Sequence, residues 1–490
     1  MRLSAMVTAS LLLLTGCAPA QTNDPILRLE QGQDVMSQVL TWENCEDGFE
    51  CAVVGAPLDW LAEESDFIPL SLIRKADSAD RPVIFVNPGG PGVSGVDWMR
   101  DGYETVGSAE LRDQFQLIAF DPRGVGDSAG VTCPTQSIKD AVYYTQSPHP
   151  FGSEADIAYS REVLGAFASD CQKVGFDTAF FNTQQAARDL ELLRVVTGAP
   201  SLNFLGFSYG TLLGSTYAAL FPDKVGKLVL DGAINPLMSE SEMLLGQVAG
   251  FDSTFRAYLA DCIEKVQCPF NKDVESAITL VAQFLEERES KTLKTQLDRE
   301  LSLQATLAGI IATLYSEESW VYLSQAFDEA LDGDGTTFLL LADFYNNREL
   351  ERGYTSNLNE ANLAISCADN RIPESEAKTL DSKFAQASAV FGKYFAQPHL
   401  ACESWPAGKS TVNLDFGVKL ASAPLVVGTT GDPATPYAQA VALSQLLDGA
   451  VLLTLKADRH TAYGSNTCID AIVEAYFRGE DIGTGDKTCN

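Results

Sequence analysis

Short apolar runs recur along most of the chain and alternate with segments of helical spacing. Strands that are apolar throughout and separated by helices are typical of a parallel sheet covered on both faces. A helix is indicated over residues 183–197. A second helical stretch follows the glycine-flanked turn after residues 202–205 and ends at residue 221. The pattern therefore predicts an α/β protein with a mostly parallel central sheet. The runs that predict its strands cover residues 68–73, 82–87, 115–121, 202–205, 227–230, 425–429 and 450–455.

The pattern changes over residues 237–417, which are rich in Leu, Ala and Glu and contain few strand-like runs. This stretch is typical of helices, and it separates strands that otherwise belong to one sheet. We therefore expect a mainly helical cap domain inserted into the α/β core. The core itself would be formed by residues 41–236 and 418–490.

The first residues have the pattern of an export signal. One positive charge is followed by an apolar run over residues 3–14, which is too short to span a bilayer. The run ends in Leu-Thr-Gly-Cys, which resembles a bacterial lipobox. We expect residues 1–16 to be a lipoprotein signal peptide and residues 17–40 a polar tether, with acyl chains on Cys17 holding the protein at a membrane surface. The alternative is a plain cleaved signal.

This reading places the protein in the bacterial cell envelope, facing the periplasm or the exterior. No later segment has 18 uninterrupted apolar residues, so we expect no other membrane span.

Composition narrows the class of protein. The chain has 490 residues, 46% of them hydrophobic, so it can bury a large core and is neither disordered nor collagen-like. Its 66 acidic and 34 basic residues give a formal charge of −32 at pH 7, which argues against nucleic-acid binding and favours cationic ligands such as free amino termini. Only three histidines are present, which argues against a multi-histidine metal centre: His149, His399 and His460.

Ten cysteines remain once Cys17 is assigned to lipidation. Disulfides are their expected use, because an exported protein meets an oxidising compartment. Ten cysteines allow about a thousand pairings, and from the spacing we adopt the sequential one. Its five pairs are Cys45–Cys51, Cys133–Cys171, Cys262–Cys268, Cys367–Cys402 and Cys468–Cys489.

Residues 206–210, Gly-Phe-Ser-Tyr-Gly, follow an apolar strand and precede a helix, which is the context of a nucleophile elbow. Glycines flank the nucleophile because the turn is tight, and the strained turn lifts the serine Oγ clear of the sheet. The helix N-terminus behind it favours developing negative charge. Ser208 is therefore the expected nucleophile, and the alternative is a glycine-rich turn with a buried serine.

The acid and the base are expected after the nucleophile, in the order Ser, Asp or Glu, His. His460 follows the last predicted strand, whereas His399 lies in the expected cap and is interpreted as a surface or cap-contact residue. Asp432 follows the preceding strand and is the expected acid, which would fix the tautomer of His460 and stabilise the imidazolium. Asp231, at the end of an earlier strand, is the rival. Asp458 is disfavoured because it is too close to His460 in sequence.

The oxyanion needs backbone donors. One is the N–H of Tyr209, the residue after the nucleophile. The other is expected from the glycine-rich loop 87–92, where we favour Gly90 over its neighbour Gly89.

The same loop offers an alternative of another class. Residues 90–95 match G-x-G-x-x-G after a strand, the dinucleotide-binding fingerprint of an oxidoreductase. The acidic residue that this fingerprint needs about 20 residues on is not clearly present, and the nearest strand-end acid is Asp121. An exported protein would also meet little NAD, so we expect no cofactor.

These motifs together resemble the α/β-hydrolase family of prolyl and tripeptidyl aminopeptidases, including secreted tripeptidyl aminopeptidases and their lipoprotein carboxylesterase relatives. The resemblance runs from about residue 42 to the C-terminus, and the cap is its least recognisable part. The family's Ser, Asp and His fall at positions that match Ser208, Asp432 and His460, and Arg459 stands where the family pattern has a small residue. The matching stretches are NPGGPG (87–92), FDPRGVGDS (120–128), NTQQAARDLELLR (182–194), NFLGFSYGT (203–211), LVLDGAINP (228–236) and GDPATP (431–436).

The resemblance implies an α/β-hydrolase fold and a serine exopeptidase that cleaves peptides from a free N-terminus, often releasing tripeptides. Such an enzyme must bind the α-ammonium group, and Asp369, beside an expected disulfide, is the candidate carboxylate. Its alternative is a solvated surface acid. A carboxylesterase would use the same triad on acyl esters, so the triad does not separate these two activities. A non-catalytic surface binding protein is a third hypothesis, against which the complete Ser, Asp and His set argues.

Overall fold

A computed structural model describes residues 34–46, 48–270 and 273–490. The expected signal peptide (1–16), Cys17 and most of the expected tether (17–40) lie outside these residues. Within the described ranges, no helix has both the length and the apolar character needed to cross a membrane.

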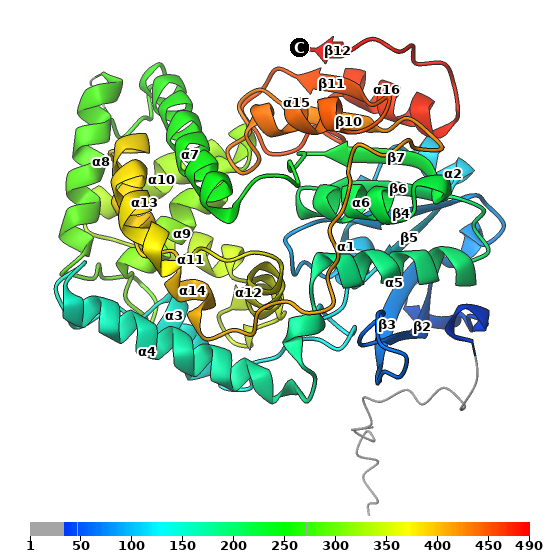
Figure 1. Cartoon of the computed structure of the whole chain (residues 1–490). Helices are drawn as coiled ribbons and strands as arrows, with labels where there is room; N and C mark the ends of the chain where they lie inside the picture. The colour runs from blue at the N-terminus through cyan, green and yellow to red at the C-terminus, as the bar shows by residue number, and fades with distance from the viewer. Residues whose placement is uncertain (1–33, 47, 271–272) are drawn as a thin grey trace, which may run out of the picture.

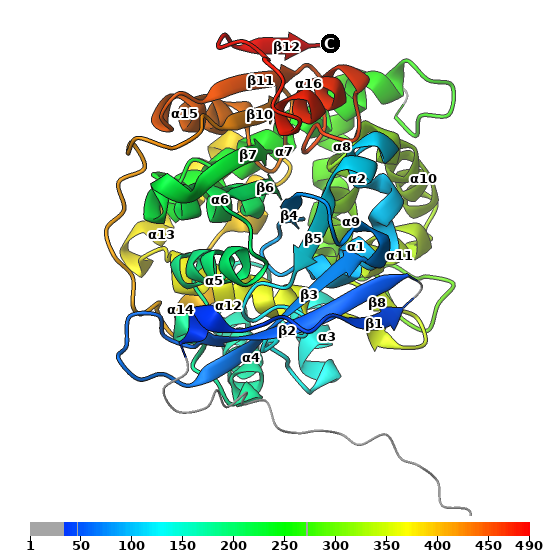
Figure 2. The ribbon, with the colours of Figure 1, turned by 90° about the vertical axis from the view of Figure 1, so that its right-hand side faces the viewer.

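A ten-stranded sheet forms the centre of the α/β part of the molecule, in the order β1-β2-β3-β5-β4-β6-β7-β10-β11-β12 (Figures 1 and 2). The strands from β5 to β12 run parallel, which confirms the predicted α/β fold class with its mostly parallel sheet. The bounds are β1 Glu43–Glu46, β2 Phe49–Pro57, β3 Phe67–Lys75, β4 Val83–Asn87, β5 Gln116–Phe120, β6 Leu202–Phe207, β7 Val225–Asp231, β10 Leu425–Thr429, β11 Val451–Leu455 and β12 Lys487–Cys489.

Strands β1, β2 and β3 form an antiparallel edge that pairs with β5. The sequence pattern did not predict β1 or β2. The exposed or half-buried positions that interrupt β2 break the continuous apolar run of a buried parallel strand. At the other edge, β12 is only three residues long and leaves no apolar pattern to detect.

Helices cover both faces of the sheet, because successive strand residues point to opposite sides. Phe85 and Ile118 pack in the hydrophobic core under one set of helices, whereas Val86 and Ala119 pack in the core on the opposite face. The first face is covered by α5 (Thr183–Val196), α6 (Tyr209–Leu220) and α15 (Tyr437–Leu446). The second is covered by α1 (Gly95–Gly102), α2 (Ala109–Gln114) and α16 (Thr467–Phe477) (Figure 2).

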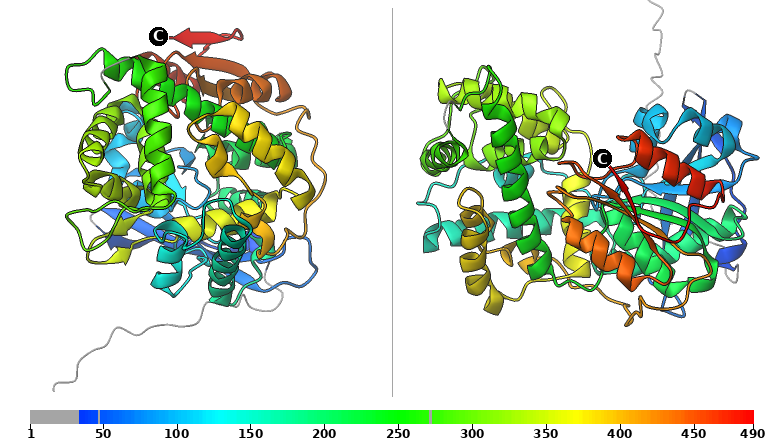
Figure 3. Two further views of the ribbon diagram at one scale, coloured as in Figure 1. Left: turned by 90° about the vertical axis from the view of Figure 1, so that its left-hand side faces the viewer. Right: turned by 90° about the horizontal axis from the view of Figure 1, so that it is seen from above.

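Among the described residues, eight α-helices lie between β7 and β10 in the chain and form a body beside the sheet, called here the helical insertion (Figures 1 and 3). This body has its own hydrophobic core, in which Phe255, Phe327 and Phe338 are fully buried. Its helices are α7 Glu240–Ile263, α8 Val274–Arg288, α9 Leu303–Leu314, α10 Trp320–Leu331, α11 Thr336–Tyr345, α12 Leu358–Asp369, α13 Glu374–Ala387 and α14 Leu400–Glu403. A two-stranded hairpin, β8 (Arg348–Glu349) with β9 (Gly353–Tyr354), precedes α12.

Two helices from an earlier part of the chain lie against the helical insertion. α3 (Gln136–Tyr143) and α4 (Glu154–Cys171) precede β6, within the range expected to be core, and α4 runs below the insertion in Figure 1. Phe167 of α4 packs edge-on to Trp405, which follows α14, with ring centroids 6.3 Å apart. The helical side of the molecule is therefore built from two separate parts of the chain.

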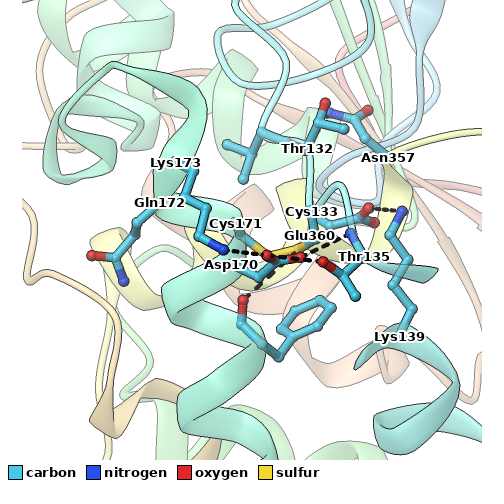
Figure 4. Close-up of a disulfide and its surroundings, with 12 residues drawn as sticks. Thr132, Cys133, Thr135, Lys139, Asp170, Cys171, Gln172, Lys173, Asn357 and Glu360 are labelled. Carbon is cyan, nitrogen blue, oxygen red and sulfur yellow. Dashed lines mark hydrogen bonds and ion pairs between the residues drawn. A yellow bond between two sulfur atoms is a disulfide. The ribbon is translucent and has the colours of Figure 1, made fainter. Parts of the chain in front are cut away.

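Polar contacts hold helix α12 to a loop of the sheet domain and to α3. Asn357, which precedes the helix, makes three hydrogen bonds of 2.9–3.0 Å to backbone groups of the loop 124–131. Glu360, inside the helix, forms a buried ion pair with Lys139 of α3 (Figure 4). These contacts fix α12 relative to the loops at the ends of the strands.

The ten cysteines lie in five disulfides, in the sequential order that the spacing suggested. Cys133–Cys171 joins the segment after β5 to the end of α4 (Figure 4). Next to it, the Asp170 carboxylate accepts a hydrogen bond from the Thr135 N–H at 2.9 Å. The disulfide and this hydrogen bond fix the end of α4 to the segment that leads away from the sheet.

Candidate active site

Ser208 occupies a sharp turn between β6 and α6. Its backbone has φ 52° and ψ −118°, a left-handed conformation that costs a residue other than glycine about 1–3 kcal/mol. The strand and the helix approach closely here, because a Cβ on Gly206 would lie 2.5 Å from the Gly210 carbonyl oxygen. The Ser208 N–H donates to the Asp231 carbonyl oxygen at 2.8 Å, which ties the turn to β7. The local geometry is that of the predicted elbow.

His460 and Asp432 lie in contact on the loops that follow β11 and β10. His460 Nδ1 lies 2.9 Å from both carboxylate oxygens of Asp432, and the Asp432 side chain is fully buried. The same carboxylate accepts hydrogen bonds from the N–H groups of Ala434 and Thr435, at 3.0 and 2.8 Å. These donors fix the carboxylate so that it faces the imidazole.

The electrostatic environment makes His460 a stronger base. Burial by itself lowers the pKa of His460, but the carboxylates of Asp432 and Asp231 more than offset burial. The net effect raises the pKa above its ordinary value of 6.5. An imidazole with a raised pKa accepts a proton more readily when it deprotonates a hydroxyl.

Asp231, the rival acid, holds the histidine loop instead. Its carboxylate accepts hydrogen bonds from the backbone N–H groups of Ala462 at 3.0 Å and Tyr463 at 2.7 Å, which follow His460 closely in sequence. Burial raises the pKa of Asp231 to about 6. The structure therefore separates two acids that the sequence left open: Asp432 contacts the ring of His460, and Asp231 anchors its backbone.

The helical insertion holds the same loop from the other side. The backbone N–H of His460 donates a hydrogen bond to the Tyr315 carbonyl oxygen at 2.8 Å. The rings of His460 and Tyr315 stand edge to face, with centroids 5.4 Å apart. Arg459 pairs with Glu318 at 3.2 Å, and the Asp458 N–H donates to Glu317 Oε1 at 2.8 Å. Arg459, the departure from the family pattern, thus has a partner in the insertion.

Two cavities meet at Ser208. The first, called here the insertion cavity, has a volume of about 410 Å³ and lies between the sheet domain and the helical insertion. The second, called here the Trp98 cavity, has a volume of about 260 Å³ and is also lined by His460, Trp98 and Phe207. Of the described residues, Ser208 alone lines both cavities.

The expected oxyanion donors lie beside the nucleophile. Gly90 and Tyr209 both line the insertion cavity together with Ser208. The Gly89 N–H, in contrast, donates to the Asn87 side chain at 3.1 Å. Because that N–H is already occupied, the geometry favours Gly90 over Gly89 as the second donor.

The dinucleotide alternative is not supported by the loop that suggested it. A Cβ on Gly92 would lie 2.4 Å from the Leu358 carbonyl oxygen, so α12 packs directly on this glycine. Asp121, the nearest strand-end acid, accepts hydrogen bonds from Ser94 Oγ at 2.8 Å and the Val96 N–H at 3.1 Å. Gly92 therefore allows α12 to pack closely on the loop, and Asp121 fixes the start of α1.

Asp369 lies at the end of α12, is half-buried and lines the insertion cavity together with Ser208. Burial raises its pKa to about 6. Its two carboxylate oxygens accept hydrogen bonds from the Thr183 N–H at 2.7 Å and the Thr183 hydroxyl at 2.5 Å. The same hydroxyl lies 2.8 Å from the Tyr209 hydroxyl. Asp369 is therefore not a solvated surface acid, and it is linked through Thr183 to the residue after the nucleophile.

Glu240, at the start of α7, is a functional candidate that the sequence did not reveal. It lines the insertion cavity near Asp369, and burial and that neighbouring carboxylate together raise its pKa to about 7. Among the described residues, no hydrogen bond or ion pair occupies the Glu240 carboxylate. The sequence signal was masked because Ser239 and Glu242 form a capping box, which explains acidic residues at this point by helix capping alone.

The histidine of the expected cap is not a surface residue, although its neighbours Pro398 and Ala401 line the insertion cavity. His399 is buried beside α14 and lines neither of the cavities that Ser208 lines. Within the described ranges, no group of three or more His, Cys, Asp or Glu side chains is arranged to hold a metal ion.

Comparison with known proteins bears on this geometry. The model of the alpha/beta hydrolase fold family matches residues 82–463. Serine protease Hip1 of Mycobacterium tuberculosis is 31% identical over 511 residues, covering 99% of this chain and 96% of that protein. Carboxylesterase B of the same organism is 32% identical over 499 residues, covering 97% and 95%. Tripeptidyl aminopeptidase of Streptomyces coelicolor is 28% identical over 477 residues, covering 92% and 86%.

Among solved structures, Rv0554 from Mycobacterium tuberculosis aligns with a TM-score of 0.39 and 13% identity, covering 88% of this chain and 99% of that one. The family model matches most of the chain, and two of the relatives exceed 30% identity over nearly its full length. The chain therefore belongs to the α/β-hydrolase family and is a serine hydrolase.

Proposed function

We propose that the protein is an exported aminopeptidase that releases short N-terminal units, tripeptides among them, from peptides with a free amino terminus. In this mechanism His460 takes the proton of Ser208, whose Oγ attacks the carbonyl carbon of the scissile bond. The N–H groups of Tyr209 and Gly90 hold the oxyanion. His460 then protonates the leaving amine, and water activated by the same imidazole hydrolyses the acyl-enzyme.

Asp432 and Asp231 divide the support of the base between them. Asp432 accepts a hydrogen bond from the Nδ1–H of His460, keeps Nε2 directed at the nucleophile and stabilises the imidazolium. Asp231 holds the backbone that follows His460, because its carboxylate accepts hydrogen bonds from the N–H groups of Ala462 and Tyr463. Catalysis by this set uses the side chains and backbone of the chain and calls for no cofactor.

The observation that carries the peptidase proposal is the pair of carboxylates in the insertion cavity. Glu240 and Asp369 line the cavity that also contains the nucleophile. Their raised pKa values reflect burial and, for Glu240, the neighbouring negative charge. An α-ammonium group placed between them relieves this repulsion and gains charge-assisted hydrogen bonds. The neutral chain of an acyl ester offers no such partner.

Two of the relatives are named as peptidases, which agrees with this proposal, and one is named as a carboxylesterase. Carboxylesterase activity is the second candidate function, because the same serine, histidine and aspartate would cleave an ester through the same acyl-enzyme. The carboxylate pair is the feature that favours the peptidase.

The proposal includes export with a lipid anchor at Cys17. It is supported by the lipobox-like N-terminus and by the five disulfides, which persist in oxidising compartments and are rare in the cytosol. Peptides in the cell envelope or its surroundings would then be the substrates.

A substrate panel with purified protein and its Ser208→Ala variant tests the activity. The panel holds tripeptide amides with free and with acetylated amino termini, single-residue amides and short acyl esters. We expect cleavage of free tripeptide amides that requires Ser208 and collapses on acetylation. If acetylation is without effect and esters turn over far faster than every amide, the protein is a carboxylesterase and the amine-binding role of the carboxylates is wrong.

A further inference from the structure

The Trp98 cavity has no part in the mechanism described above, although it opens onto the nucleophile. His460, Trp98 and Phe207 are among its lining residues, as is the exposed Thr105. The rings of Trp98 and Phe207 stand edge to face, with centroids 6.1 Å apart. A cavity with aromatic walls beside a nucleophile is suited to an apolar or aromatic group.

The two cavities differ in the chemistry of their linings. The insertion cavity holds the carboxylates Glu240 and Asp369 and the proposed oxyanion donors, whereas the Trp98 cavity holds the imidazole. The acyl part of a substrate lies with the oxyanion donors. The leaving group must lie near His460, because that residue gives it a proton.

We propose that the Trp98 cavity binds the leaving-group side of the substrate, and that it selects an apolar or aromatic side chain on the first residue after the cleaved bond. This inference deepens the proposed function and rests on it for the identity of the acyl part. In this arrangement the peptide crosses Ser208, with its α-ammonium in the insertion cavity and its remaining length emerging past Thr105.

The selectivity can be measured without the cleaved peptide, by adding amines that compete with water for the acyl-enzyme. The acceptor nitrogen attacks the acyl carbonyl carbon, and the new C–N bond forms as the bond to Ser208 Oγ breaks. His460 moves the proton from the acceptor nitrogen to Oγ. The ratio of new amide to hydrolysed acid reports how well the acceptor occupies the leaving-group side, and it does not depend on the amount of active enzyme.

The experiment uses a tripeptide methyl ester with a free amine and three acceptors: glycinamide, leucinamide and phenylalaninamide. Burial of an apolar side chain predicts that the wild-type protein favours the two larger acceptors over glycinamide by about tenfold or more. Thr105→Trp, which fills the cavity from an exposed position, and Trp98→Ala, which removes an aromatic wall, should each reduce this preference to about twofold. Asp101→Trp is the matched control, because Asp101 is exposed and lines neither cavity.

The outcome that overturns the proposal is a wild-type protein that does not distinguish the acceptors. A change in the preferred acyl group in Thr105→Trp or Trp98→Ala, with the acceptor preference unchanged, also overturns it, because the cavity would then bind the acyl part. Repeating the competition between acceptor amines and water with a short acyl ester as the acyl donor separates this inference from the proposed function. Acceptor selectivity on that ester, without cleavage of free tripeptide amides, supports the leaving-group cavity and refutes the aminopeptidase.

Discussion

Recognition of the substrate amine is the property that separates an aminopeptidase from an esterase, and Glu240→Gln tests it with little change of shape. Glu240 faces the insertion cavity, and within the described residues no cation or hydrogen-bond donor is paired with it. The substitution removes one negative charge and leaves a side chain of nearly the same size. The substrate ammonium then loses its ionic partner while the triad is untouched.

The size of the effect follows from the environment of the charge. Two unit charges about 4 Å apart attract by about 1 kcal/mol in water and about 4 kcal/mol at an effective dielectric constant of 20. Glu240 is half-buried, so it lies between these limits. At about 1.4 kcal/mol for each factor of ten, its loss corresponds to a decrease of about fivefold to several hundredfold in kcat/KM for a free-amine substrate.

The assay compares kcat/KM for a free tripeptide amide with kcat/KM for its N-acetylated form. A pH near 7.5 is suitable, because the pKa of Glu240 is about 7 and that of a peptide amine is about 8. At that pH most of the carboxylate is ionised and most of the amine is protonated. The ratio of the free-amine value to the acetylated value should fall in Glu240→Gln, because only the free amine loses its ionic partner. Damage to the triad would instead lower both values together and leave their ratio unchanged.

Two further variants make the test specific. Glu242→Gln removes an exposed charge on the same helix and preserves the capping box, which accepts either residue, so it should leave the ratio unchanged. Asp369→Asn should lower the rates on both substrates, because the Asp369 carboxylate also holds Thr183 and, through it, Tyr209. If neither Glu240→Gln nor Asp369→Asn changes the ratio of free to acetylated substrate, binding of the amine by these carboxylates is refuted.

Other predictions concern the triad and the anchor. The raised pKa of His460 predicts that kcat/KM falls as pH decreases through a value above 6.5, because the protonated imidazole cannot act as the base. Asp432→Asn should lower kcat by about 10⁴ and shift this acid limb to lower pH, as seen in a pH-rate profile of the residual activity. Asp231→Asn should shift the acid limb in the same direction by less and reduce kcat by a smaller factor, because it removes one of the two charges that raise the pKa of His460. Asp458→Asn is the control for this variant and should leave the acid limb in place. An unshifted limb in both Asp432→Asn and Asp231→Asn would contradict this account. Cys17→Ser should move the protein from the membrane fraction to the soluble fraction of fractionated cells, and retention in the membrane fraction would show that Cys17 is not the anchor.

Much of the fold could be predicted from the sequence because it depends on local patterns. Continuous apolar runs such as residues 425–429 identify buried parallel strands, since a strand covered on both faces is apolar at every position. Strand β2, which lies between β1 and β3, mixes exposed and buried positions, so its pattern is ambiguous and its pairing depends on the neighbouring strands. The helices α3 and α4 could not be assigned to the helical side, because their contacts with α12 and α14 are made by residues more than 200 positions away.

Some residues of the candidate site could be identified from the sequence, whereas others needed the tertiary structure. Ser208 and His460 could be identified from the sequence, because the elbow is a short motif with a steric cause and only two histidines follow it. The choice between Asp432 and Asp231 needed the tertiary structure, since both acids follow strands and only their positions in space show which one meets the ring. Glu240 was hidden because its local context is explained by helix capping, and its meaning comes from Asp369 and Ser208, which reach the same cavity from distant parts of the chain. The sequence by itself determined the chemistry that the chain carries, and only the tertiary structure decided which charged groups surround it, because electrostatic interactions depend on separation in space and on burial.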